Sequence, residues 1–301
     1  DLLLNKPYVD IILGPDSYRR IPEIIQNRSD LLEHVVDTKL SKYEVYDDLF
    51  PSRKSGVNAW ISIMRGCDKF CTFCIVPFTR GRERSRSVSS IVKEAKNIIK
   101  SGYQEITLLG QNVDSYLWYG GGAKKDFKKA SNEEKENSLN FANLLKKVAQ
   151  VNPKLRIRFS TSNPQDMGVA VIDTMSKHAN ICNHIHLPVQ SGSSRILKLM
   201  NRGYDREKYF KLIDDIKKRI PDCAISMDMI IGFCTENEKD YKETLSLMDY
   251  VKYDFGYMFK YSVRPNTPAS RLEDDVPEDV KQRRLAEIIK KQQTHSLLHM
   301  Q

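Results

Sequence analysis

The chain has 301 residues, of which 40% are hydrophobic and 29% are charged. These values are typical of a globular protein with room for one large domain or two ordinary ones. No run approaches the roughly 18 apolar residues of a membrane span, and no signal-type leader opens the sequence. Lys and Arg exceed Asp and Glu by nine, which favours a polyanionic partner, although a lysine-rich solvated surface would give the same count. Six cysteines are too few for a disulfide framework and favour a reducing, cytoplasmic location.

Residues 1–52 predict a small α/β unit. The stretch 8–14 (YVDIILG) has the pattern of a strand, and 14–26 (GPDSYRRIPEIIQ) predicts a turn that enters a helix, with Pro22 near its start. A Pro/Ser/Gly-rich connector at 50–56 (FPSRKSG) marks the predicted boundary with the following domain.

Strand and helix patterns then alternate six times, in a domain that we place at residues 53–265. The predicted strands are 58–66, 104–112, 154–164, 181–192, 223–233 and 255–265, and the predicted helices are 87–102, 138–151, 166–178, 193–203 with 205–220, 237–251 and 277–298. Six strand–helix repeats predict parallel strands with right-handed crossovers, and hence an α/β fold that forms a partial (β/α)6, TIM-like barrel. Such folds place their sites at the carboxyl edge of the strands.

Residues 119–138 interrupt this alternation between the second strand and its helix. The stretch is rich in glycine, lysine and glutamate and has almost no apolar periodicity. It predicts a mobile insertion, and an inert surface loop is the simplest interpretation.

Three cysteines, Cys67, Cys71 and Cys74, follow the first strand of the barrel with the spacing Cys-x3-Cys-x2-Cys. Three thiolates can hold three irons of a [4Fe–4S] cluster and leave the fourth iron open to a small chelating ligand. A zinc site needs a fourth ligand, and no histidine lies within forty residues after Cys74. Three inert buried cysteines remain the alternative, although Asp68 and Lys69 between them favour a loop.

This spacing after a first strand resembles that of the radical S-adenosylmethionine (radical SAM) enzymes. The longer runs MRGCDKFCTFCIVPFTRGRERSR (64–86), LLGQNVDSY, HLPVQSGSSRILKLMNRGY, MDMIIGF and YSVRPNTPASRLEDDVP resemble the methylthiotransferases of this superfamily over nearly the whole chain. Within that family the resemblance is closest to enzymes that add a methylthio group at carbon 2 of N(6)-dimethylallyladenosine next to the anticodon of tRNA. It implies two molecules of S-adenosylmethionine, one as methyl donor and one as radical source.

The resemblance also implies roles for individual residues. Cys67, Cys71 and Cys74 would hold the cluster, and Arg202 is a suitable partner for the carboxylate of the cofactor because a guanidinium pairs bidentately with it. Each of the other positions could instead be an ordinary turn, cap or core residue. The full set of expected cofactor contacts is Phe73, Gly110, Gln111, Asn112, Ser160, Thr161, Gln190, Arg202, Asp228 and Ile231.

A run of alternating arginines follows the cysteines. In an extended segment Arg80, Arg82, Arg84 and Arg86 would project to one side and could contact RNA phosphates, and Phe78 could stack on a splayed-out base. A solvated basic loop is the alternative.

The sequence departs from the family in several places. Methylthiotransferases carry a second, auxiliary [4Fe–4S] cluster on three cysteines of an N-terminal domain, but this chain has no cysteine before Cys67. We therefore expect residues 1–52 to be the end of that domain, and residues 266–301 to form a C-terminal helix leading toward an RNA-binding β-barrel (TRAM) domain outside this sequence. Such a chain should cleave the cofactor but not insert sulfur. Cys234 stands where relatives usually have proline, and we interpret it as a packed thiol.

Several alternatives stay open at this point. The substrate could be threonylcarbamoyl-adenosine in tRNA or an aspartate of a ribosomal protein, and a non-catalytic, zinc-bound RNA-binding module would also account for the charge and the cysteines. For the enzyme, the expected partners are a tRNA anticodon stem-loop, an electron donor such as a flavodoxin, and an iron–sulfur or sulfur carrier protein, with no membrane.

Overall fold

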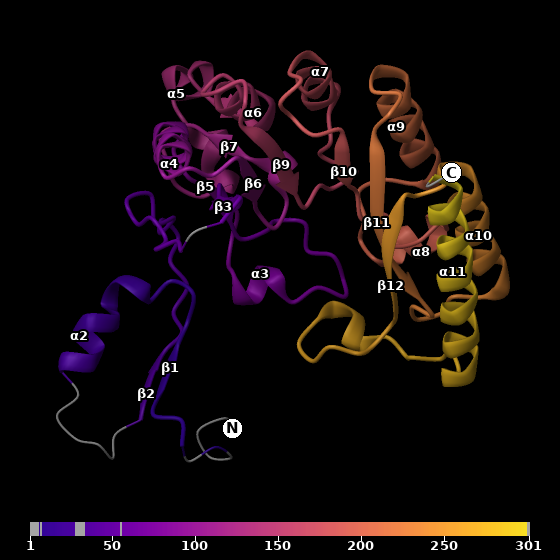
Figure 1. Cartoon of the computed structure of the whole chain (residues 1–301). Coiled ribbons are helices and arrows are strands. Elements are labelled where there is room, and N and C mark those ends of the chain that lie inside the picture. Colours follow the sequence, from indigo (N-terminus) through magenta and orange to yellow (C-terminus); the bar gives the residue numbers. More distant parts are fainter. Residues whose placement is uncertain (1–5, 7, 28–33, 55, 300–301) are drawn as a thin grey trace.

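The computed structural model describes residues 6, 8–27, 34–54 and 56–299 (Figure 1). Residues 1–5, 7 and 28–33 of the predicted first unit, and Ser55 of the predicted connector, lie outside these residues.

The first unit is small and follows the sequence prediction. It contains β1 (Ile11–Leu13), η1 (Tyr18–Arg20), α2 (Ile21–Gln26) and β2 (Val35–Asp37). The two strands are parallel, with Ile11 opposite Val35, and Pro22 lies in the first turn of α2. Figure 1 shows this unit, in indigo, to one side of the larger body of the chain.

The larger body is built on six parallel strands within the part of the chain that the structure describes. They are β3 (Asn58–Ser62), β6 (Glu105–Leu109), β9 (Arg156–Ser160), β10 (His184–His186), β11 (Ala224–Ile231) and β12 (Phe255–Lys260). They lie in sequence order as two sheets, β3-β6-β9 and β10-β11-β12, and a parallel bridge between Ile157 and Ile181 connects the two sheets. The strand order and direction confirm the predicted α/β fold with six strand–helix units.

Each of these strands is followed by a helix. The long helices are α4 (Val88–Lys100), α6 (Phe141–Ala149), α7 (Val169–Lys177), α9 (Arg206–Arg219), α10 (Glu238–Val251) and α11 (Glu278–His299). The shorter elements are β4 (Met64–Arg65), which pairs with β5 (Arg84–Ser85), α3 (Val76–Thr79), η2 (Val113–Ser115), β7 (Leu117–Trp118), which pairs with β8 (Leu139–Asn140), α8 (Ser194–Leu199) and η4 (Pro268–Arg271). Among the described residues, no helix combines the length and the apolar character that crossing a membrane would need.

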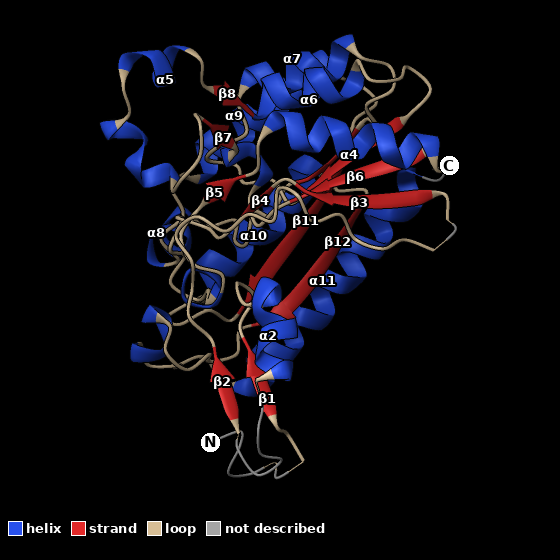
Figure 2. Cartoon of the chain, turned by 90° about the vertical axis from the view of Figure 1, so that its left-hand side faces the viewer, coloured by secondary structure: helices blue, strands red, loops and turns tan. Residues whose placement is uncertain are grey.

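The alternation of side chains along the strands separates a core from an open face. Ile61, Ile106 and Ile157 are fully buried and belong to one apolar cluster with residues of the surrounding helices. Their neighbours along the strands point the opposite way, and Trp60 and Tyr257 on this second face are 61% and 57% exposed. Figure 2 shows the helices α4, α6 and α7 stacked over one side of the strands. The second face is therefore the concave side of the partial barrel.

Helix α4 shows how local sequence sets these boundaries. It begins where the Ser87 side chain accepts a hydrogen bond from the Ser90 N–H, and the chain leaves it at Gly102 with a φ of +88°. Its buried residues Ile91, Ala95 and Ile98 recur at spacings of four and three, which places them on one face.

The insertion at 119–138 lies between β6 and α6 as predicted, but it is not irregular. It contains η3 (Lys124–Lys129) and α5 (Asn132–Glu136), and Ser131 and Glu134 form a capping box at the start of α5. Tyr119 is buried and its ring lies 5.2 Å from that of Phe127. These short helices were not predicted, because two aromatic anchors eight residues apart leave no periodic pattern in the sequence.

Candidate cluster and cofactor site

The three cysteines lie on a loop, residues 66–74, between β4 and α3. Gly66 opens this cysteine loop with a φ of +74°, and a Cβ there would lie 2.2 Å from the carbonyl oxygen of Arg82. At the centre of the loop the Thr72 N–H donates to the Met200 carbonyl (3.1 Å), and the Thr72 hydroxyl donates to the Leu199 carbonyl (3.0 Å). The C-terminal end of α8 therefore holds the loop in place.

The thiols of the loop are free, with Cys71 buried and the other two half-buried. Burial raises the pKa of the Cys67 thiol to about 12, and burial also raises the pKa of Cys74. Both thiols therefore keep their protons at neutral pH, and metal binding would have to release them. Among the described residues, no three His, Cys, Asp or Glu side chains are close enough together to hold a single metal ion. The support for a cluster comes from the shared cavity and the chemistry of its lining.

A cavity of about 380 Å³ opens beside the cysteine loop, at the carboxyl ends of the strands. Ten of the residues predicted from the sequence line it: Cys67, Phe73, Cys71, Cys74, Gly110, Gln111, Thr161, Gln190, Arg202 and Asp228. The other lining residues were not predicted from the sequence; they are Lys69, Val76, Ser162, Asn163 and Pro188. Ser162 and Asn163 could have been included, because they directly follow Thr161 in the run at the end of β9.

Two strand ends shape the floor of this cavity. A Cβ on Gly110, after β6, would lie 2.6 Å from Met64 Cγ, so glycine permits the close approach of the two strands. Gln190 has a φ of +73°, and its backbone exchanges hydrogen bonds with β11: its N–H donates to the Asp228 carbonyl and its carbonyl accepts from the Ile230 N–H, both at 2.9 Å. Gln190 and Asp228 are thereby fixed side by side.

Arg202 places a positively charged guanidinium, fixed by three contacts, beside the cysteine loop. Its Nη1 lies 3.2 Å from Cys71 Sγ, its Nε donates to the Tyr204 hydroxyl at 3.0 Å, and its Nη2 donates to the Pro188 carbonyl at 3.0 Å. Burial acts to lower the pKa of Arg202, but Tyr204 and Cys71 outweigh it and raise this pKa above its ordinary value. The guanidinium stays charged and can pair with the carboxylate of a ligand or with thiolate charge.

A second cavity of about 380 Å³ adjoins the first and shares Phe73, Cys74, Gln190 and Asp228 with it. It continues along β12, where Phe259, Tyr261 and Arg264 line it. These three residues were not predicted from the sequence, although strand alternation places Phe259 on the concave face with Tyr257. The two cavities meet at Phe73 and Asp228.

Three predicted contacts are not part of this lining. Ile231 is fully buried in the apolar core. Ser160 contacts its neighbour, with Oγ 3.4 Å from Thr161 Oγ1. Asn112 is buried, and its side-chain amide donates to Asp166, which also pairs with Lys69. Asn112 thus supports the lining residue Lys69 and does not itself face the cavity.

The arginine segment, residues 80–86, does not present its arginines on one exposed side. Arg84 is buried and donates from Nη2 to both carboxylate oxygens of Asp16 at 2.8 Å. Arg86 is buried as well, and its Nη1 lies 2.8 Å from Glu94 Oε2. The predicted projection of Arg84 and Arg86 to one exposed side is therefore wrong, because each is paired with a buried carboxylate, and this pairing gives no support to phosphate contact by either residue.

The remaining predicted RNA contacts lie at the surface next to the cysteine loop. Phe78 is 52% exposed and packs edge-on against Phe70, with ring centroids 6.3 Å apart. Arg80 is exposed, whereas Arg82 pairs with Asp68, Nε to Oδ1 at 2.7 Å. The exposure of Phe78, Arg80 and Arg82 is compatible with RNA binding, and their role in it stays a prediction.

Cys234 does not line either cavity of the site. It is fully buried in a small apolar cluster with Ile196, Met200, Phe233 and Tyr261. Burial raises the pKa of its thiol. These surroundings agree with the interpretation of Cys234 as a packed thiol.

This arrangement of a cysteine loop after the first of six parallel strands, with polar groups at the strand ends, is that of one enzyme class. Residues 61–248 match the family described as the Radical SAM superfamily. The chain belongs to the radical SAM superfamily.

Its close relatives carry one name. The chain is 61% identical over 297 residues to a tRNA-2-methylthio-N(6)-dimethylallyladenosine synthase from Christiangramia forsetii, 55% identical to one from Flavobacterium johnsoniae, and 49% identical over 292 residues to one from Bacteroides fragilis. These alignments cover 98%, 98% and 96% of the chain, but 62%, 62% and 61% of the relatives. The chain therefore spans about three fifths of the length of these curated relatives.

Solved structures share the fold at low sequence identity. Apo cobalamin-dependent S-adenosylmethionine radical enzyme OxsB matches with a TM-score of 0.56 at 14% identity, over 90% of this chain and 39% of that one. Coproporphyrinogen III oxidase from Escherichia coli matches with a TM-score of 0.52 at 17% identity, over 79% and 52% of the two chains. These likenesses support the radical SAM fold.

Proposed function

We propose that this chain carries the radical SAM core of a tRNA methylthiotransferase that acts on carbon 2 of N(6)-dimethylallyladenosine next to the anticodon. The observation that carries the proposal is the single cavity in which the three cysteines meet Arg202, Gln190 and Asp228. The name shared by relatives at 49–61% identity supports the substrate.

The lining residues fit a [4Fe–4S] cluster and S-adenosylmethionine. Three free thiols on one loop match the ligand set of a cluster with an open iron, and the Arg202 guanidinium is a partner for the carboxylate of the cofactor. When bound, such a cluster supplies the electron that cleaves S-adenosylmethionine to a 5′-deoxyadenosyl radical.

The work of the chain itself is to bind, orient and exclude water. Gln190 and Asp228 offer hydrogen-bonding groups to a hydroxyl-rich ligand, and Phe73 offers an aromatic surface to its adenine. Val76 and Pro188 add apolar surface to the same cavity, which limits the access of water to reactive species.

Anaerobic reconstitution with iron and sulfide tests the cluster assignment. The chain should turn brown, bind about four irons and form 5′-deoxyadenosine from S-adenosylmethionine under a reductant. Cys71→Ala should lose the colour and the product, whereas the matched control Cys234→Ala should keep both. A colourless, zinc-loaded protein, or equal iron in both variants, would overturn the assignment and favour a zinc-bound module.

The substrate assignment is tested separately with the full-length protein. Incubation with tRNA carrying N(6)-dimethylallyladenosine, with tRNA carrying threonylcarbamoyl-adenosine, and with ribosomal protein should give a methylthio product only in the first, detected by mass. A product in either of the others would replace the proposed substrate.

The proposal also assigns parts and partners of the longer protein. We place the boundaries of the core at residues 53–265, with 1–52 as the end of the N-terminal methylthiotransferase domain and 266–301 leading toward a TRAM domain. The ligands of the auxiliary [4Fe–4S] cluster would lie outside this sequence. The anticodon stem-loop, an electron donor such as a flavodoxin and an iron–sulfur or sulfur carrier protein are the proposed partners, in the cytoplasm.

A further inference from the structure

A line of polar side chains crosses the concave face of the barrel between its two edges. His184 and His186 project from β10, and Ser226 and Asp228 project from β11, each pair two residues apart and so on one face of its strand. The line begins at His184, at the amino-terminal end of β10, and ends at Asp228, where the two cavities of the site meet.

The contacts along this line are continuous. His184 Nε2 lies 2.9 Å from Ser226 Oγ, and His186 Nδ1 lies 3.0 Å from the same oxygen. His186 Nε2 lies 3.5 Å from Asp228 Oδ1. Ser226 is fully buried, so its hydroxyl has the two imidazoles as partners and no contact with water.

The chemistry of these groups gives the line a direction. A serine hydroxyl has one proton, so Ser226 donates to one imidazole and accepts from the other. An ionised Asp228 only accepts, so a neutral His186 that faces it must carry its proton on Nε2 and leave Nδ1 bare. Ser226 then donates to His186 Nδ1 and accepts from His184 Nε2–H, and every donor points toward Asp228.

The surroundings hold both rings in this arrangement. The His184 ring stacks on Phe255 with centroids 5.4 Å apart and an interplanar angle of 18°, and the His186 ring meets Tyr257 edge-on at 6.3 Å. Burial lowers the pKa of His184, assisted by Arg158 and His186 and opposed by Asp254, so this imidazole is neutral at neutral pH.

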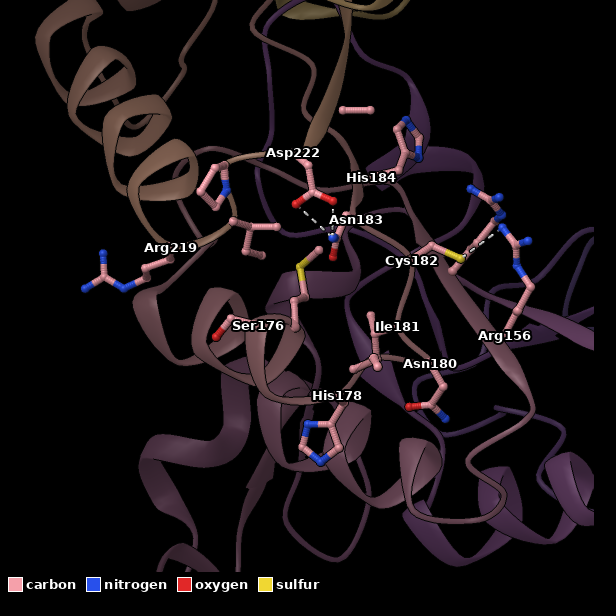
Figure 3. Close-up of a pocket in the computed structure, with 16 residues that line it drawn as sticks. Arg156, Ser176, His178, Asn180, Ile181, Cys182, Asn183, His184, Arg219 and Asp222 are labelled. Atoms are coloured by element: carbon pink, nitrogen blue, oxygen red, sulfur yellow. Dashed lines mark hydrogen bonds between the residues drawn. The ribbon is translucent and has the colours of Figure 1, made fainter.

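The far end of the line reaches a different cavity. His184 borders a cavity of about 750 Å³ at the amino-terminal edge of β9, β10 and β11, which Arg156 and Asp222 also line (Figure 3). The line therefore connects the side of the barrel opposite the cysteine loop with the carboxylate at the proposed cofactor site.

We infer that His186 is a positioning residue that, with Ser226 and His184, fixes the Asp228 carboxylate as a hydrogen-bond acceptor for the hydroxyl groups of the cofactor. The inference rests on the proposed S-adenosylmethionine site. The contact of 3.5 Å is longer than an ideal hydrogen bond, and such contacts tighten when a ligand engages the carboxylate. A neutral donor on a charged acceptor makes one of the stronger hydrogen bonds, so its loss should be measurable.

The first test measures the affinity of anaerobically reconstituted protein for S-adenosylmethionine by equilibrium dialysis. His186→Leu removes the donor at similar volume and should weaken binding about tenfold. His186→Gln keeps an N–H near the position of Nε2 and should restore most of the affinity. His178→Gln, a histidine of the opposite cavity that contacts the Thr174 carbonyl, is the matched control and should bind like the parent. Parent-like binding by His186→Leu, with its thermal unfolding unchanged, would overturn the inference.

The second test reads the tautomers directly and does not depend on the cofactor. In 15N-histidine spectra of the metal-free chain, His184 and His186 should both carry the proton on Nε2, and Asp228→Ala, which removes the acceptor that faces Nε2, should abolish this preference in His186. A proton on Nδ1 of His186 in the parent would overturn the inference. If the parent fails to bind S-adenosylmethionine but shows the expected tautomers, the cofactor site is wrong and the positioning of Asp228 stands for another ligand.

Discussion

The cysteine loop (66–74) and the arginine segment (80–86) are close in sequence, yet they use their side chains in opposite ways. The loop directs Cys67, Cys71 and Cys74 into the cavity, where their thiols have no covalent partner. The segment turns Arg84 and Arg86 inward, onto carboxylates that are themselves buried. The thiols of the cysteine loop remain free to bind a ligand, whereas the guanidinium groups of Arg84 and Arg86 are held in buried ion pairs.

A basic run beside a candidate site is therefore not by itself a binding surface. Arg84 reaches Asp16 in the small α/β unit, and Arg65 lies 3.1 Å from the same carboxylate, so the two arginines join that unit to the barrel. Exposed Arg80 and the half-exposed Arg82 are left for a ligand at the surface.

The largest effect is expected from removing the Arg84–Asp16 pair, which connects the small α/β unit to the barrel. Arg84→Met leaves Asp16 buried with one partner fewer and should lower the free energy of unfolding by about 3–5 kcal/mol, as measured by urea denaturation. Arg82→Met should cost less, about 1 kcal/mol, because the Arg82 side chain is 40% exposed and its pair with Asp68 is partly screened by water. Equal losses in the two variants would show that the segment is not divided into structural and surface arginines.

A second prediction concerns Glu83, which lies between these arginines and is buried. Burial raises the pKa of its carboxyl to about 7, above the ordinary value of 4.5, so the folded state holds this proton more tightly than the unfolded state. Its contribution to stability is full below pH 4.5 and is lost as the pH rises to about 7.

Glu83→Gln removes this titration. The unfolding free energy of the variant relative to the parent should therefore rise between pH 4.5 and 7, by up to about 3 kcal/mol, and be constant above. Thermal or urea unfolding at pH 5 and pH 8 measures the difference. A difference that does not change with pH would mean that Glu83 ionises normally in the folded chain.

The smallest effect is expected from the exposed Arg80, on the affinity for RNA. Arg80→Glu should weaken the binding of an anticodon stem-loop several-fold and lower the slope of log affinity against log salt by about one. Arg219→Glu, the same charge change beside Asp173 at the opposite edge of the barrel, is the matched control and should bind like the parent. Equal weakening in both variants would indicate a general charge effect in place of a local contact.

Much of the fold could be predicted because its signals are local. The helix α4 has a serine cap, an apolar face and a terminal glycine within sixteen residues, and the strands β3, β6 and β11 are short runs rich in apolar residues. The insertion escaped prediction because its order depends on the contact between Tyr119 and Phe127, which leaves no periodic pattern.

The candidate site divides in the same way. The strand ends predicted Gly110, Thr161, Gln190 and Asp228, and these residues line one cavity, since parallel strands bring their carboxyl ends to one edge; their contact with a cofactor stays a prediction. Whether a particular side chain at a strand end faces the cavity depends on twist and packing, and Ile231 and Ser160 are not part of the cavity lining for that reason.

The cysteine loop and the six strand–helix units could be predicted from the sequence, because spacing and periodicity act over a few residues. The burial and pairing of the arginines could be seen only in the folded chain, since Arg84 pairs with a carboxylate 68 positions away that no local pattern indicates. The tertiary structure alone also placed Ser226 between His184 and His186, some forty positions distant, where β10 and β11 lie side by side. Burial and pairing across such separations are properties of the packed chain, and they set which polar groups remain free to act.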